Sequence, residues 1–197
     1  MENSTCEILP QDCNKFDYSF KLIIIGDSGV GKSSLIKRTI KNVFESDCQP
    51  TLGCEFYTFI TKIKNNIVKC QIWDTCGQEK YRSLIPSFYN NLSLAIIIYA
   101  INDISSFDNV NFWLNELKNK ASVDIKIVLI GNKADLEDER KISKEEIETS
   151  AKNGINAKEV FMECSKILFL EKQKYNKINN SFENNDDKNI KINIKKK

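Results

Sequence analysis

The chain has 197 residues with a formal net charge of +2 at pH 7, and 41% of its residues are hydrophobic and 28% charged. This length fits one α/β domain with short extensions, and the balanced charge gives no reason to expect a nucleic-acid partner. The chain has no histidine and its seven cysteines form no CxxC pair, which excludes a Cys/His metal site and a Ser/His catalytic pair. Scattered thiols of this kind are typical of a reducing, cytosolic compartment.

The first predicted elements are an arm, a strand and a helix. Residues 1–17 show no periodicity and do not resemble a signal peptide, so we expect a flexible arm there. The continuous apolar run 20–25 predicts a strand that is buried on both faces. After a glycine-rich stretch, Leu35, Ile36 and Ile40 recur at helical spacing and predict a helix.

A long loop and a β-hairpin are expected next. Residues 42–51 show neither helical nor strand periodicity, and a loop of this length is often functional. Residues 56–63 and 67–73 are rich in β-branched and aromatic side chains, and a short polar turn separates them. They predict a hairpin that supplies one antiparallel edge of a sheet. Residues 81–89 predict a short, irregular helix that Pro86 interrupts.

The remaining elements alternate between strand and helix. Residues 94–101 predict another buried strand, which is too short to cross a bilayer. Ser105 or Ser106 is expected to cap the helix that follows, and residues 126–130 predict the next strand. A hairpin followed by this alternation predicts an α/β fold with a doubly wound, mostly parallel sheet and helices on both faces. Ligands of such sheets bind at the carboxyl ends of the strands.

A phosphate-binding loop is predicted between the first strand and the first helix, in the stretch Gly26-Asp27-Ser28-Gly29-Val30-Gly31-Lys32-Ser33. Its glycines allow backbone N–H groups to surround a polyphosphate, and the helix adds the positive end of its dipole. Lys32 is expected to reach the β- and γ-phosphates, and the Ser33 hydroxyl to ligate Mg²⁺. A glycine-rich turn without a ligand is the alternative. The strand before the motif and the helix after it favour a P-loop NTPase-type fold.

A second motif, Asn132-Lys133-Ala134-Asp135, follows the strand at 126–130. The Asp135 carboxylate can accept two hydrogen bonds from guanine, whereas adenine offers no matching pair of donors. A site built to bond such groups rejects a base that lacks them by factors of order 10⁴ to 10⁵. A polar turn with a lysine is the alternative for this motif alone. Together with a phosphate loop, the motif predicts guanine recognition.

Further positions complete the expected site. Asp74 ends the second hairpin strand, where its carboxylate can hold Mg²⁺ through water, and Gly77 can offer a backbone N–H to a γ-phosphate. Gln78 is placed to orient a water molecule for in-line attack. In the loop before the hairpin, the Thr51 hydroxyl can complete the Mg²⁺ shell, and Phe44 is suited to lie over the base. Taken singly, Thr51 is an ordinary turn residue after a proline.

Taken in order, the segments GDSGVGKSS, PTLG, WDTCGQE, GNKAD and ETSAK resemble the motifs of a small GTPase of the Ras superfamily. Within that superfamily the chain is similar to the Rab family, on PTLGCEF, on KYRSLIPSFY and on the aromatic residues Phe56, Trp73 and Phe88. The RSLIPS segment is most similar to the Golgi-trafficking subgroup. The resemblance covers residues 18–175.

The resemblance implies a switch that binds GTP and Mg²⁺, hydrolyses GTP slowly to GDP and phosphate, and regulates vesicle trafficking. Its implied partners are an exchange factor, a GTPase-activating protein and effectors that contact Phe56, Trp73 and Phe88. The implied location is the cytosol and the cytosolic face of endomembranes, including the Golgi. The implied catalytic residues are Lys32, Gly77 and Gln78. The implied Mg²⁺ ligands are Ser33, Thr51 and Asp74. The implied nucleotide contacts are Gly26, Asp27, Ser28, Gly29, Val30, Gly31, Lys32, Ser33, Ser34, Phe44, Thr51, Gly77, Asn132, Lys133, Asp135, Ser150, Ala151 and Lys152.

The segment after Asp135 is shorter than the family pattern requires. A parallel crossover needs about a dozen residues, plus about five for the next strand, and residues 136–148 cannot supply both. In one interpretation Ser150-Ala151-Lys152 supports the base, and the last helix contains Ala157 to Leu168. A wrong gene model or an alternative splice is a further explanation of the shortening.

A second interpretation of the same segment restores the strand at the expense of the last helix. It places a helix over residues 143–153, which Gly154 terminates, and a strand over 160–164. Ser165-Lys166 then supports the base. Both interpretations leave one element damaged.

The last residues have the composition of a disordered tail. Residues 176–197 are rich in Asn and Lys, so we expect the GTPase domain to occupy residues 18–175. Rab proteins usually finish with prenylated cysteines, but no cysteine follows Cys164 in this sequence. Membrane association is therefore expected from the family, without a C-terminal lipidation cysteine to support it.

Two alternatives to a cycling GTPase stay open. One is a guanine-nucleotide-binding module that no longer cycles, weakened by the shortened segment and by Cys76, which stands where the family usually has alanine. The other is a P-loop kinase or ATPase, which would bind ATP as tightly as GTP. Substitution of Gln78 and of Asp135 separates these alternatives from the leading hypothesis.

Overall fold

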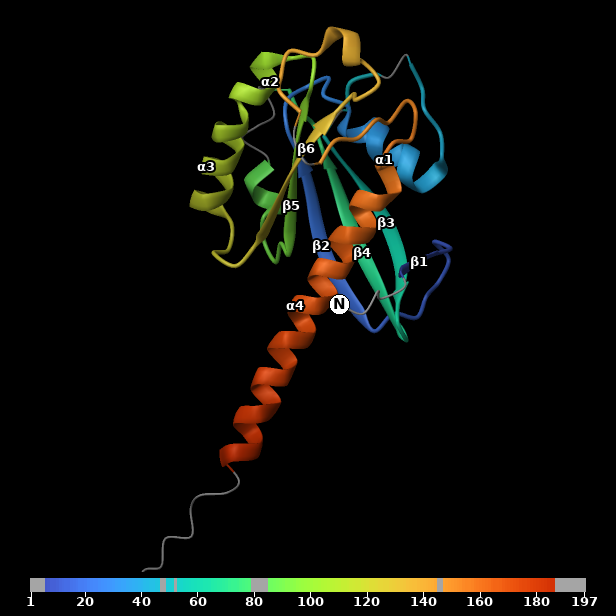
Figure 1. Cartoon of the computed structure of the whole chain (residues 1–197). Coiled ribbons are helices and arrows are strands. Elements are labelled where there is room, and N and C mark those ends of the chain that lie inside the picture. Colours follow the sequence, from blue (N-terminus) through green and yellow to red (C-terminus); the bar gives the residue numbers. More distant parts are fainter. Residues whose placement is uncertain (1–5, 47–48, 52, 79–84, 145–146, 187–197) are drawn as a thin grey trace, which may run out of the picture.

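The computed structural model describes residues 6–46, 49–51, 53–78, 85–144 and 147–186, which form a sheet of six strands with helices on both faces (Figure 1). The strand order is β1-β3-β4-β2-β5-β6. The strands are β1 (Cys6–Leu9), β2 (Tyr18–Ile25), β3 (Cys54–Ile63), β4 (Asn66–Thr75), β5 (Leu94–Ala100) and β6 (Lys126–Asn132). The helices are α1 (Lys32–Lys41), α2 (Ile104–Asp108), α3 (Val110–Lys120) and α4 (Ala157–Asp186), with a 3-10 turn η2 (Glu137–Glu139).

The strands β4, β2, β5 and β6 run parallel to one another. Their registers pair Ile24 with Asp74 and Ala100 with Asn132, so their carboxyl ends meet at the same edge of the sheet. β3 runs antiparallel to β4, as the hairpin predicted. The structure therefore confirms the doubly wound, mostly parallel sheet, and it brings the predicted motifs to one edge.

Two apolar layers cover the sheet. α1 and α4 pack on one face, with side chains that include Leu35, Ile36 and Phe161. α3 covers the other face with Trp113 and Leu117. Because β5 lies between the two layers, all of its side chains are buried, which explains its continuous apolar run.

The predicted flexible arm contains a strand. Residues 6–9 form β1 and pair antiparallel with β3, with Cys6 opposite Ile63. Further along the arm, the Asp17 carboxylate accepts a hydrogen bond of 2.7 Å from the Ile67 backbone N–H. Four residues are too few to show a strand period, and β1 forms because the open edge of β3 offers backbone partners. β1, rather than the hairpin, is therefore the outer strand on this side.

The predicted disordered tail begins as a helix. α4 continues to Asp186, past the expected domain boundary at residue 175. Phe169 is its last buried apolar side chain among the described residues. Extending an existing helix costs much less than starting one, so the turns that pack on the sheet continue into residues 176–186. Residues 187–197 lie outside the described part of the chain.

The helix predicted after β5 is split in two at Asn109. Its N-cap is Asp103, whose carboxylate accepts a hydrogen bond of 3.1 Å from the Ser105 backbone N–H. Neither Ser105 nor Ser106 is the cap. Ser106 is buried, and its hydroxyl accepts a hydrogen bond of 3.0 Å from the Ala100 backbone N–H. A serine and an aspartate are both good caps, so the local sequence does not distinguish Asp103 from the serines.

The segment after Asp135 retains only traces of a helix and a strand. Among its described residues, 136–144 and 147–156, it holds the 3-10 turn η2 and, in place of a strand, one parallel bridge between Gly131 and Glu148. The first interpretation of the elements agrees with the structure, since α4 begins at Ala157. The second is wrong, because residues 160–164 belong to α4 and pack their apolar stripe on the sheet.

Candidate functional site

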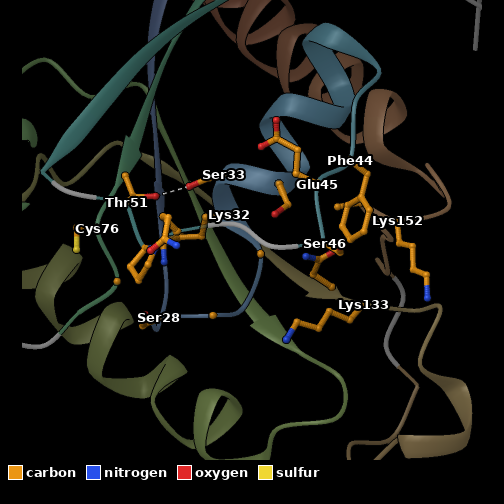
Figure 2. A pocket seen from close by; sticks show the side chains of 18 of the residues that line it. Ser28, Lys32, Ser33, Phe44, Glu45, Ser46, Thr51, Cys76, Lys133 and Lys152 are labelled. Atoms are coloured by element: carbon orange, nitrogen blue, oxygen red, sulfur yellow. Dashed lines mark hydrogen bonds between the residues drawn. The ribbon is translucent and has the colours of Figure 1, made fainter.

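A cleft of about 490 Å³ lies at the carboxyl ends of the parallel strands (Figure 2). Most of the predicted site residues line it: Ser28, Gly29, Gly31, Lys32, Ser33, Ser34, Phe44, Thr51, Gly77, Gln78, Asn132, Lys133, Asp135, Ala151 and Lys152. Further lining residues that we did not predict for the site are Glu45, Ser46, Gln49, Pro50, Cys76 and Leu136. Residues far apart in the sequence are therefore brought together around one cavity.

The glycine-rich loop between β2 and α1 has a backbone that only glycine adopts easily. Gly26 has φ of 141° and Gly31, at the N-cap of α1, has φ of 95°. A Cβ atom on Gly26 would overlap the carbonyl oxygen of Ile98 in β5. The loop is thus held close to the sheet, and it delivers the N-terminus of α1 to the cleft.

Lys32 lies at the bottom of the loop and is 6% exposed. Its ammonium donates hydrogen bonds of 2.9 Å to the Gly26 carbonyl and 2.7 Å to the Asp27 carbonyl. Gly77 comes so close that a Cβ atom there would overlap the Lys32 ammonium. A buried positive charge beside two backbone segments is suited to an anionic ligand.

Three oxygen-bearing side chains meet beside Lys32. The hydroxyls of Ser33, in the first turn of α1, and Thr51, in the loop before β3, lie 2.6 Å apart in a hydrogen bond (Figure 2). Asp74 is fully buried at the end of β4, and neither of its carboxylate oxygens makes a hydrogen bond among the described residues. Burial raises the pKa of Asp74 to about 6, while the nearby Ser33 hydroxyl and Lys32 ammonium oppose this shift.

This set of oxygens fits a magnesium ion. Mg²⁺ prefers oxygen ligands and usually binds through one or two carboxylates together with hydroxyls, water and phosphate. A buried carboxylate without hydrogen-bond partners is costly in the absence of a cation. The chemistry of Ser33, Thr51 and Asp74 therefore agrees with the predicted ligand set.

On the other side of the cleft, Asn132 joins two loops. Its side chain is 1% exposed. Its Nδ2 donates a hydrogen bond of 2.8 Å to the Val30 carbonyl in the glycine-rich loop, and its Oδ1 accepts one of 3.0 Å from the Thr149 hydroxyl. Asn132 therefore fixes the distance between the phosphate loop and the loops that follow β6.

Asp135 is held in one orientation by the loop before α4. The Ser150 hydroxyl donates a hydrogen bond of 2.5 Å to its Oδ1, and the Lys152 ammonium lies 4.0 Å from its Oδ2. Ser150 itself is fully buried behind the cleft wall. The Ser150 bond thus fixes one carboxylate oxygen, and the other oxygen is available to a ligand beside the exposed Lys152 ammonium.

Arg38 of α1 was missed by sequence reasoning and supports this loop. Its Nε donates a hydrogen bond of 2.6 Å to the Ala151 carbonyl, and its Nη2 donates one of 2.7 Å to the Lys152 carbonyl. The only sequence signal is a basic residue in the last turn of a helix. α1 therefore holds both the phosphate loop, at its start, and the base-supporting loop, near its end.

Three predicted residues of the glycine-rich loop, Gly26, Asp27 and Val30, do not line the cleft. Val30 is buried in the core beneath α1. The Asp27 carboxylate accepts hydrogen bonds of 2.6 Å from Asn109 Nδ2 and 3.0 Å from Trp113 Nε1, both near the start of α3. Nothing in the sequence spacing pointed to these contacts. They fix the loop to α3.

The predicted effector residues form a surface cluster outside the cleft. The Trp73 ring lies between Phe56, at 5.4 Å, and Phe88, at 5.3 Å, measured between ring centroids. Phe56 is 50% exposed. Phe88 belongs to a 3-10 turn at 85–88, and residues 81–84 of the predicted irregular helix lie outside the described residues. The three rings are contiguous and reachable from solvent.

The shortened segment is stabilised by Arg140. Its guanidinium donates hydrogen bonds of 2.8 and 2.9 Å to the two carboxylate oxygens of Glu148, and it also bonds Glu137 in η2. Ile142 is 6% exposed, and its backbone N–H donates to the Ile101 carbonyl at 3.2 Å. These contacts fix the start of the loop whose Ala151 and Lys152 line the cleft.

The comparisons with known proteins agree with this geometry. The family described as "Ras family" matches residues 21–184. The chain is 44% identical over 160 residues to GTP-binding protein ypt3 of Schizosaccharomyces pombe, an alignment that covers 75% of each chain. It is 41% identical over 160 residues to Ras-related protein RABA1b of Arabidopsis thaliana and to Ras-related protein Rab11B of Nicotiana tabacum, covering 75% of this chain and 74% of each relative.

Proposed function

The chain belongs to the Ras family and, within it, to the Rab small GTPases, and from this premise we propose how its cleft works. It is a guanine-nucleotide switch that hydrolyses GTP to GDP and phosphate and regulates vesicle trafficking. The observation that carries our assignment of the site is the hydrogen bond of 2.8 Å from Asn132 Nδ2 to the Val30 carbonyl. It joins a phosphate-type loop and a base-type loop in one cleft.

The phosphates are proposed to lie along residues 26–34, at the N-terminus of α1. Lys32 contacts the β- and γ-phosphates, supported by its burial and its position at the bottom of the loop. The hydroxyls of Ser33 and Thr51 would hold Mg²⁺ directly, and Asp74 would hold it through water. When bound, this ion neutralises phosphate charge. Thr51 then couples the loop before β3 to the presence of the γ-phosphate.

Hydrolysis is proposed to depend on the residues that follow β4. The Gly77 backbone N–H contacts the γ-phosphate, supported by its close approach to Lys32. Gln78, which lines the cleft, orients the attacking water. The water oxygen forms a bond to the γ-phosphorus while the bond from that phosphorus to the β–γ bridging oxygen breaks, and GDP leaves. Lys32 stabilises the charge on the transferred group.

The base is proposed to bind between Phe44 and the loops after β6. Asp135 accepts hydrogen bonds from the guanine ring N–H and amine, and the Ser150 hydroxyl keeps its carboxylate in place. Phe44 is 36% exposed and lines the cleft, which supports its place against the base. Lys133, Ala151 and Lys152 complete the wall.

The chain acts with regulators and effectors, as Rab proteins do. We assign an exchange factor and a GTPase-activating protein to the nucleotide cycle, because nothing in the described cleft supplies an arginine finger. Effectors are proposed to contact Phe56, Trp73 and Phe88, supported by the exposure of Phe56 and the contiguity of the rings.

The Rab assignment places the chain in the cytosol and at endomembranes, and the Golgi is the compartment we propose. That proposal is supported by the RSLIPS segment. No helix of the described residues has the length and apolar character needed to cross a bilayer.

Substitution of Asp135 by Asn tests the base assignment. An amide presents a donor where guanine needs an acceptor, so Asp135→Asn should weaken GDP by about a hundredfold or more and move the preference toward xanthosine diphosphate. The measurement is a titration with both fluorescent nucleotides. Asp138→Asn, in the exposed turn η2, is the matched control. Unchanged GDP binding by Asp135→Asn would show that the carboxylate does not contact the base.

Substitution of Gln78 by Leu tests the hydrolytic assignment. Leu cannot orient a water molecule, so single-turnover hydrolysis of GTP should slow by about tenfold or more while GTP affinity is kept. Gln71→Leu, on β4 and outside the cleft, is the control. A non-cycling module predicts equal rates for the wild type and Gln78→Leu. That result would exclude the proposed role.

A further inference from the structure

β6 is an outer strand of the sheet whose free edge is open. It pairs with β5 along its whole length. On its other side, the Gly131 N–H donates to the Ile147 carbonyl at 3.1 Å and the Gly131 carbonyl accepts from the Thr149 N–H at 2.8 Å. Since backbone groups alternate along a strand, those of Ile127 and Leu129 also face outward. Among the described residues, none bonds to them there.

The shortened segment cannot close this edge. Ile142 is bonded to Ile101 beyond β5, and Ile147 is bonded to Gly131, so both ends of residues 143–146 lie at the carboxyl end of β6. Four residues span at most about 14 Å when fully extended. The open part of β6, residues 126–130, is about 17 Å long, and the chain would have to cover it twice. The partner strand must come from elsewhere.

The open edge carries apolar side chains. Ile127 and Leu129 are each 37% exposed and alternate with Val128 and Ile130, which belong to the core on the face covered by α1 and α4. They therefore lie on the α3 face. A flat edge with exposed apolar side chains is a template for another strand. The strand that fits would carry apolar residues at every second position.

The C-terminal sequence contains such a pattern. In Asn189-Ile190-Lys191-Ile192-Asn193-Ile194-Lys195, three isoleucines alternate strictly with polar residues. Strict alternation over this length is the signature of a strand with one apolar face. The segment follows α4 and lies outside the described residues. No element that the structure describes accounts for this alternating pattern.

We propose that residues 190–194 of a second copy of this chain add to β6 as an extra strand, with their isoleucines beside Ile127 and Leu129. The partner cannot be the same chain. Glu171 of α4 lies beside Lys126 at the start of β6, in an ion pair of 3.5 Å. From Glu171 the helix continues to Asp186, about 22 Å further at 1.5 Å per residue. Figure 1 shows α4 projecting away from the sheet.

The four steps from Asp186 to Ile190 could return at most about 14 Å toward the sheet, which is well short of that distance. A second copy has no such restriction, because its own projecting helix can carry the tail to the first molecule. Two copies that exchange tails form a closed pair in which both edges are covered.

The first experiment compares oligomeric state. Sedimentation velocity of the full chain with GDP should show a species of twice the monomer mass that grows with concentration. Ile192→Lys should abolish it, because a lysine would face the apolar side chains of β6. Asn193→Lys adds the same charge on the opposite face and should leave the dimer intact. A wild type that stays monomeric at all concentrations, or an Ile192→Lys variant as dimeric as the wild type, would overturn the proposal.

The second experiment locates the contact. Hydrogen exchange should slow at the amides of Ile127 and Leu129 in the dimer, and a peptide of residues 187–197 added to monomeric Ile192→Lys should slow it too. Protection without any effect of Ile192→Lys or of the peptide would instead indicate direct pairing of two β6 edges. GDP binding, measured on the same samples, should be equal in all variants. The outcome is therefore independent of the proposed nucleotide site.

Discussion

Asp74 is proposed to help hold Mg²⁺, but in the absence of the ion its buried carboxylate destabilises the folded protein. It is fully buried, and burial raises its pKa from 3.8 to about 6. In the protein without a cation, folding must therefore desolvate a charged carboxylate at neutral pH. The pKa of Asp74 is higher in the folded protein than in the unfolded chain. The protonated carboxyl therefore contributes its full stability below about pH 4, and this contribution is lost as the pH rises through 6.

We expect Asp74→Asn to stabilise the protein that lacks nucleotide and Mg²⁺. The raised pKa corresponds to about 3 kcal/mol at pH 7.5, and an amide does not ionise. The free energy of unfolding in EDTA should thus be higher in the variant at pH 7.5 and similar to that of the wild type at pH 4. Denaturant unfolding across this range measures it.

Asp108→Asn, on the exposed side of α2, serves as the control for that series. With Mg²⁺ present, the wild type should bind nucleotide more tightly than Asp74→Asn, because the variant has lost a carboxylate that the ion requires. Parallel pH profiles for the wild type and Asp74→Asn would show that the carboxylate is not destabilised by burial.

At the level of elements, the segment between β6 and α4 shows how a lost helix and strand are replaced. Glu148 is 8% exposed, and Arg140 supplies two hydrogen bonds in a fork that matches its carboxylate. In the part of this segment that the structure describes, the strand is represented by one bridge from Glu148 to Gly131. Arg140 therefore holds the start of the loop that supports the base, and Arg38 holds its middle through the Ala151 and Lys152 carbonyls.

We expect Arg140→Gln to weaken both stability and guanine binding. Removing the guanidinium leaves the nearly buried Glu148 without its charged partner, which costs about 2 kcal/mol. GDP affinity should fall with it, because Ser150 loses its support and no longer orients Asp135. Unfolding in urea and GDP titration measure the two effects.

Lys120→Gln is the control for the ion pair, since Lys120 pairs with Glu116 on the exposed side of α3. A surface pair of this kind contributes about 0.5 kcal/mol or less. If Arg140→Gln behaves like Lys120→Gln in both measurements, Arg140 does not position the base-supporting loop.

At the scale of the whole molecule, the cleft is the place where separate parts of the chain are joined. α1 holds the phosphate loop and, through Arg38, the loop before α4. Asn132 links the first of these loops to the end of β6, and Thr51 links α1 to the loop before β3. The cleft is therefore lined by segments from the start of α1, the loops before β3 and after β4, and the loops on both sides of residues 136–150.

We expect nucleotide to stabilise the entire domain, not only the loops. A ligand that binds only the folded state raises the free energy of unfolding by about 2.7 kcal/mol at one hundred times its Kd. Calorimetry at rising GDP concentration in Mg²⁺ should show one transition whose midpoint increases steadily. Addition of EDTA should lower it again, and Asp135→Asn should shift the response to higher GDP. A midpoint that is independent of GDP would contradict the proposed site.

The sequence by itself determined the parallel sheet and most of the cleft. Glycine positions, apolar runs and polar residues at strand ends are local features, and their consequences are the same in any chain that carries them. The roles proposed for Gly26 to Ser33, Asn132 and Asp135 were predicted for this reason. Asp74 and Thr51 followed from their order along the chain.

Only the tertiary structure decided which groups support those residues. Arg38, Asn109 and Arg140 act on residues that are distant in sequence or separated by a loop without periodicity, and β1 forms because β3 leaves an edge free. Such contacts depend on where the backbone brings two groups together, and no local pattern encodes that distance. The sequence thus specified the chemistry of the site, and the fold specified what holds it in position.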